Sequence, residues 1–82
     1  MSDYMKNLFE ITDYHLCVTL CVLGFKLTSI DKTNPQRCVF QFENESDLQK
    51  HVEEFFRGEL RLDPRLVLLH AKLVKDRLHG GI

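Results

Sequence analysis

With 82 residues, the chain is long enough for one domain and too short for two hydrophobic cores. Apolar residues make up 44% of it and charged residues 28%, as in an ordinary globular domain and unlike a disordered chain. The net charge of −1 excludes a general electrostatic attraction to nucleic acid or to anionic membranes.

The number of cysteines and the first residues of the sequence indicate the cellular compartment of the protein. Three cysteines are present, an odd number, and the polar first residues lack the layout of a signal peptide. Both features favour a reducing cytoplasm over a disulfide-bonded scaffold. We expect a flexible N-terminus over residues 1–7, one domain over residues 8–79 and a frayed end at residues 80–82.

Residues 14–25 are apolar at nine of twelve positions. On a helical wheel these positions cover nearly every side, so the helix must be enclosed, and it is too short to cross a bilayer, which takes roughly 20 apolar residues. Thr12 or Asp13 suits the N-cap, and Gly24 suits the end of the helix. The pattern therefore predicts a buried core helix, preceded by a short extended run at residues 8–11.

A β-hairpin is predicted next. Residues 25–30 and 37–42 are rich in β-branched and aromatic side chains, and the segment between them has turn chemistry. In the second strand, Cys38, Phe40 and Phe42 alternate onto one face, which we expect to pack against the core helix. Because a two-stranded sheet is marginal by itself, it needs that helix or a third strand.

Two more helices follow the hairpin. Ser46 with Gln49 fits a capping box before a narrow apolar stripe, and Asp63 followed by Pro64 opens a third helix that runs to about residue 78. Whether residues 60–62 supply a third strand stays open. The predicted fold is α+β in the order α-β-β-α-α, with three helices packed on a β-hairpin.

The third helix carries two apolar rows, a quarter turn apart. One row consists of Leu66, Leu69 and Leu73, and the other of Val67, Ala71, Val74 and Leu78. His70 and Arg77 lie between the rows, where a charge is costly unless it is paired or near an edge. Either both side chains flank the core, with Arg77 meeting a carboxylate of the second helix, or this wedge is an interface with arginine as an anchor.

Charge is unevenly distributed along the second half. Residues 43–59 hold six acids and two bases, whereas residues 61–79 hold five bases and two acids. The two segments are complementary, within one chain or across a dimer. The alternative is a phosphate-binding face made by Arg61, Arg65, Lys72 and Lys75. Aromatic side chains for base stacking are scarce, because the phenylalanines mostly belong to the predicted core.

The cysteines are the residues most suited to metal binding or to reactivity. Cys17, Cys21 and Cys38, with His15, have the ligand types of a tetrahedral zinc site. They lie in apolar stretches, however, and lack the paired short spacing of a zinc knuckle, so we expect buried, reduced and metal-free thiols. No phosphate-binding loop, nucleophile elbow or carboxylate pair is recognisable, and we predict no cofactor and no enzymatic activity.

Several short motifs occur together. They are Asp13-Tyr14, Leu23-Gly24-Phe25, Val39-Phe40-Gln41-Phe42, Gly58-Glu59-Leu60-Arg61-Leu62-Asp63-Pro64-Arg65 and Lys75-Asp76-Arg77-Leu78-His79. In this combination, over about residues 8 to 79, the chain resembles a family of small bacterial and phage proteins known only as a domain of unknown function. The resemblance implies a shared fold and brings no reaction, cofactor or substrate.

The sequence thus predicts a cytoplasmic, non-catalytic protein-binding domain that forms a homodimer, binds an unidentified protein partner and stays off the membrane. The interface candidates are His70, Arg77, Leu66, Leu69 and Leu73. The alternative is a nucleic-acid-binding accessory protein that uses Arg61, Arg65, Lys72 and Lys75.

Overall fold

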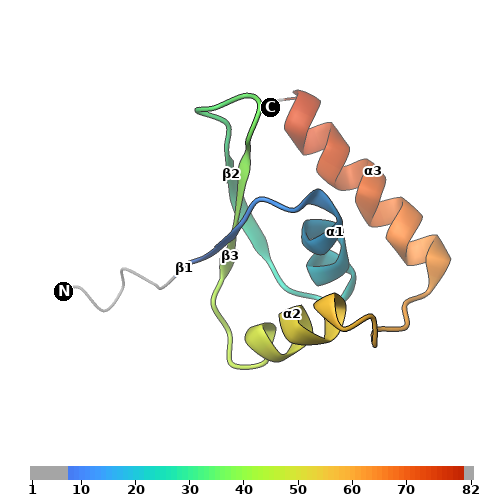
Figure 1. Ribbon diagram of the computed structural model, residues 1–82. Coiled ribbons are helices and arrows are strands. Elements are labelled where there is room, and N and C mark those ends of the chain that lie inside the picture. Colours follow the sequence, from blue (N-terminus) through green and yellow to red (C-terminus); the bar gives the residue numbers. More distant parts are fainter. Residues whose placement is uncertain (1–7, 81–82) are drawn as a thin grey trace.

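The computed structural model describes residues 8–80 as an α+β domain, which confirms the predicted class (Figure 1). The elements in chain order are β1 (Leu8–Ile11), α1 (Tyr14–Val22), β2 (Leu27–Asp31), β3 (Val39–Glu43), α2 (Leu48–Phe56) and α3 (Pro64–Gly80). Helix α3 extends one residue past the end of the predicted domain. The expectations for residues 1–7 and 81–82 lie outside the described residues.

Helix α1 is the centre of the domain. It lies between the sheet and α3, with α2 across one end (Figure 1). Five successive residues, Leu16 to Leu20, are buried, as a helix enclosed on all sides requires. The one polar member of this run, Thr19, donates its hydroxyl proton to the His15 carbonyl oxygen at 2.8 Å, so burial leaves its hydroxyl satisfied.

Both ends of α1 are closed by the residues that the sequence indicates. Of the two N-cap candidates, Asp13 is the cap, and its Oδ1 accepts a hydrogen bond from the Leu16 amide at 3.1 Å. At the other end Gly24 has φ +100°, and the amides of Gly24 and Phe25 donate to the carbonyls of Cys21 and Leu20. Only glycine adopts this φ without strain, so the helix stops here.

The sheet has one strand more than the predicted hairpin. Its order is β1-β3-β2 and both pairs are antiparallel. The extended run at residues 8–11 is the third strand, with Phe9 opposite Phe42 and Ile11 opposite Phe40. Residues 60–62 form no strand. The central strand therefore has a partner on each side, and the open edges belong to β1 and β2.

The two faces of the sheet differ as alternation predicts. Phe40 and Phe42 are buried toward α1, together with Leu27 from β2. On the opposite face Gln41 donates from Nε2 to Glu10 Oε2 at 2.8 Å and accepts from the Ser29 hydroxyl. This face is a polar row across the three strands, so the sheet buries one side only.

Helix α2 begins differently from the prediction. The capping box is absent: the N-cap is Asp47, and its side chain makes no capping hydrogen bond. A turn closes the helix start, since the Leu48 amide donates to the Glu45 carbonyl at 3.0 Å. Of the predicted apolar stripe, Leu48 and Val52 are buried, whereas Phe56, which the prediction also includes, is exposed.

Candidate functional site

Helix α3 uses only one of its two apolar rows inside the domain. Val74 is buried, and Val67, Ala71 and Leu78 pack against the core beside it. The Tyr14 hydroxyl fixes this side by donating to the Ala71 carbonyl at 2.9 Å. One side of α3 is thus packed against the core and α1.

The other row faces outward. Leu66, Leu69 and Leu73 are 43%, 49% and 46% exposed, and we call these three residues the leucine face. Exposed leucines occurring singly are ordinary on protein surfaces. Three of them at i, i+3 and i+7 on one helix form a continuous apolar strip, which is the pattern of a surface that another protein covers.

A groove of about 370 Å³ adjoins the leucine face, and we call it the α3 groove. Its walls come from the end of α1, the turn after it, the start of β2, and α3. The lining residues are Cys21, Phe25, Leu27, His70, Leu73, Val74 and Arg77. His70 and Arg77, which the sequence places between the two rows, therefore line one cavity, and Leu73 belongs to both this cavity and the leucine face. Phe25 extends this apolar wall toward α2, where its ring meets His51 edge to face.

Arg77 has a partner other than the predicted one. We expect a carboxylate of α2 in one interpretation, but Arg77 Nη1 donates to the backbone carbonyl of Leu27 at 2.9 Å. That carbonyl belongs to the edge strand β2, beside an irregularity in its pairing with β3, and an edge strand has no neighbour on its outer side. Arg77 thereby ties α3 to the sheet and keeps its cationic group at the α3 groove.

A lysine closes the C-terminal end of α3. Lys32, from the loop between β2 and β3, donates from Nζ to the carbonyl oxygens of Arg77 and Leu78 at 3.0 and 3.1 Å. A cation at the negative end of a helix is favourable, and here it also satisfies carbonyls that lack a partner within the helix. The position of Arg77 is therefore fixed by both its side chain and its backbone.

The three cysteines differ in burial. Cys17 is fully buried as predicted, but Cys21 and Cys38 are only half-buried, which corrects the expectation for these two. A hydrogen bond with Cys21 and burial raise the pKa of the Cys17 thiol, and the hydrogen bond from Cys17 lowers the pKa of Cys21. The nearby Arg77 charge lowers the Cys21 pKa further, against the opposing effect of burial.

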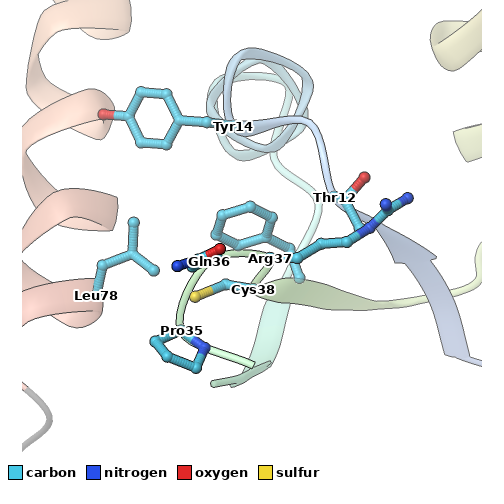
Figure 2. Close-up of a pocket in the computed structure, with 8 residues that line it drawn as sticks. Thr12, Tyr14, Pro35, Gln36, Arg37, Cys38 and Leu78 are labelled. Atoms are coloured by element: carbon cyan, nitrogen blue, oxygen red, sulfur yellow. The ribbon is translucent and has the colours of Figure 1, made fainter. Parts of the chain in front are cut away.

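A second hollow, of about 420 Å³, lies between the β2–β3 loop, the start of α1 and the end of α3. Figure 2 shows that its polar groups do not converge: Arg37 points toward Thr12, the Cys38 sulfur points toward Pro35, and Tyr14 points toward α3. The Tyr14 hydroxyl is already bound to α3. This hollow therefore lacks the few convergent polar groups of a typical ligand site.

The basic residues proposed to bind nucleic acid do not form one continuous positively charged surface. Arg65 forms an ion pair with Asp63, the residue just before α3, with 3.1 Å between Nη2 and Oδ2. This contact lowers the pKa of Asp63. Lys72 pairs with Asp76 at 3.2 Å, one helical turn later. Of the remaining candidates, Arg61 is exposed in the link between α2 and α3, and Lys75 is exposed on α3.

The walls of the α3 groove include residues that sequence reasoning missed. The sequence predicts Phe25 and Leu27 in the first strand of the hairpin and Cys21 as a buried, metal-free thiol, with no cavity between them. A weak signal exists, because Gly24 forces the chain to turn at the end of α1 and so brings Phe25 to its side. Within residues 8–80 no three histidine, cysteine, aspartate or glutamate side chains come together as a possible metal site.

Comparison with known proteins supports the resemblance noted from the motifs. No helix of the described part of the chain is long and apolar enough to cross a membrane. Searches of curated proteins and of solved structures found no significant match. The model of one protein family, described as a domain of unknown function (DUF5659), matches residues 6–76, from just before β1 to the last turns of α3. The chain therefore belongs to the DUF5659 family.

Proposed function

We propose that this protein is a small, non-catalytic protein-binding domain that forms a homodimer through the leucine face of α3. The exposed row Leu66, Leu69 and Leu73 carries the proposal, because the other apolar row of the same helix already satisfies the packing of the monomer. An apolar strip of this kind loses contact with water only when a second protein covers it.

The surroundings of the leucine face have the composition of an interface rim. On its outer side lie two ion pairs, Asp63–Arg65 and Lys72–Asp76, so charge on that side is balanced. On its inner side lies Arg77, a residue type that is enriched at interfaces. An apolar centre flanked by polar, mutually neutralised groups is the usual arrangement of a protein–protein contact.

A second copy is the occupant that fits this row most simply. If two α3 helices cross in opposite directions near Leu69, then Leu66 of each copy meets Leu73 of the other. The same patch serves both copies, and no additional complementary surface is needed. The oppositely charged segments, residues 43–59 and 61–79, favour further contact at the margins of such a pair.

The proposal predicts that Leu69→Glu dissociates the dimer. Light scattering over a range of protein concentrations should give twice the 9.7 kDa chain mass for the unaltered protein. A buried charge at the centre of the contact should weaken association about 30-fold or more, which corresponds to about 2 kcal/mol for a central interface residue. Unchanged circular dichroism would show that the variant is folded.

Leu68→Glu is the matched control. Leu68 is adjacent in the chain and, at 71%, more exposed than Leu69, but it lies off the leucine face. This variant should remain dimeric. A monomer at high micromolar concentration, or equal effects of the two variants, would contradict the proposal. Salt-sensitive DNA binding that is lost in Arg61→Gln would instead favour the nucleic-acid alternative.

A further inference from the structure

The α3 groove contains a thiol, that of Cys21, which the dimer proposal does not use. Cys21 lines it together with a guanidinium, Arg77, and an imidazole, His70. A second thiol, Cys17, lies one helical turn before Cys21 on the same helix. The other walls are apolar and aromatic. A thiol at an open cavity, close to a fixed cation, is in the environment in which cysteines become reactive.

We propose that Cys21 is a modification site for small anionic disulfides, which enter the α3 groove and are oriented by Arg77. In the exchange, the Cys21 sulfur attacks one sulfur of the disulfide, a new Cys21–S–S bond forms, and the old S–S bond breaks. The Cys21 thiol gives its proton to solvent before the attack, and solvent supplies a proton to the departing thiolate. The balance is one thiol and one disulfide consumed, one mixed disulfide and one free thiol formed, with no other reactant.

The electrostatics of the cysteine pair support this assignment. The interaction with Cys17 and the charge of Arg77 lower the pKa of Cys21 against the opposing effect of burial, which raises the fraction of reactive thiolate. Cys17 itself is fully buried and its pKa is raised. It is therefore a poor nucleophile for displacing the adduct, and the mixed disulfide on Cys21 should persist.

Cys38 provides the internal comparison. It is also half-buried and lines the second hollow, but the neighbouring Arg37 points away toward Thr12 (Figure 2). The other cation near it, Lys32, is bound to the carbonyls at the end of α3. Cys38 thus has similar access, whereas the cations near it point toward Thr12 (Figure 2) or toward the end of α3.

The test uses the folded full chain and two aromatic disulfides, dianionic 5,5′-dithiobis(2-nitrobenzoate) and neutral 4,4′-dithiodipyridine. Absorbance gives the rates, and mass spectrometry of peptides locates the first adduct. We expect the first adduct on Cys21, with the fast phase lost in Cys21→Ser and retained in Cys38→Ser. Arg77→Gln should slow the anionic reagent about threefold to fivefold, as expected for one partly exposed charge, and the neutral reagent less than twofold.

Two controls separate charge from structure. Arg77→Lys keeps the cation and should restore the rate with the anionic reagent. Lys75→Gln removes a charge from the same helix that does not line the α3 groove and should leave both rates unchanged. First labelling at Cys38, or equal slowing of both reagents by Arg77→Gln, would overturn the proposal.

Discussion

Leu20 is fully buried in the middle of the enclosed helix α1, so its side chain contributes more to stability than any exposed leucine of α3. Its neighbours belong to different elements of the core. They cannot all move inward to fill the space that a smaller side chain would leave. The effect of a substitution at this position is therefore set by the cavity as well as by the lost apolar area.

We predict that Leu20→Ala lowers the free energy of unfolding by about 2–5 kcal/mol, a large part of the stability of so small a domain. Lys72→Ala is the control, because it removes only an exposed ion pair with Asp76 and should change stability by less than about 0.5 kcal/mol. Urea titration measures both values. Similar losses in the two variants would mean that Leu20 is not a core residue.

At the scale of elements, α1 and α2 have similar ends and different beginnings. Both stop at a glycine with positive φ, Gly24 and Gly58. Only α1 has a side-chain cap, supplied by Asp13, whereas Asp47 of α2 makes no such bond. The start of α1 thus depends on one carboxylate, and the start of α2 depends on the backbone turn before it.

This difference predicts unequal effects of the same substitution. Asp13→Ala should lower the free energy of unfolding by about 1 kcal/mol, the usual value for a lost N-cap. Asp47→Ala removes no capping bond and should be close to neutral. The melting temperatures of the two variants, measured side by side, test the assignment. A larger effect at Asp47 would show that this side chain stabilises the start of α2.

Local sequence patterns predict most of the helices and strands. They do not predict the contacts between residues far apart in the sequence. The glycine stops, Asp13 and the alternation of Phe40 with Phe42 act within a few residues, so the sequence alone reveals them. The pairing of residues 8–11 with β3 cannot be predicted from the sequence, because a pattern of four residues is too weak to specify a distant partner strand. The α3 groove cannot be predicted either, since the packing of α1 against α3 brings Cys21 and Arg77 together.

Across the whole molecule, protection from solvent is concentrated in two elements. Helix α1 is enclosed by the sheet, α2 and α3, and β3 has a hydrogen-bonded strand on each side (Figure 1). By contrast, the loop at residues 32–38 is largely exposed, and α3 has one flank in solvent. Opening of the loop should require little free energy, whereas exposure of α1 requires the loss of every layer around it.

Hydrogen exchange should reproduce this order. We predict that the amides of α1 and β3 exchange most slowly, with opening free energies equal to the global free energy of unfolding. Amides of residues 32–38 should exchange fastest among the described residues. Nuclear magnetic resonance at low protein concentration provides the measurement. If α3 amides were the most protected in the monomer, α1 would not be the centre of the fold.

The pairing of β1 with β3 also has a consequence for the time course of synthesis. The strand at residues 8–11 is made first, but its partner ends at Glu43, beyond both α1 and β2. During translation, β1 therefore has no strand to pair with until β3 has left the ribosome. Phe9 and Ile11 remain uncovered in the meantime, so the earliest apolar residues of the sheet depend on prompt emergence of the rest of the chain to avoid association with other nascent proteins.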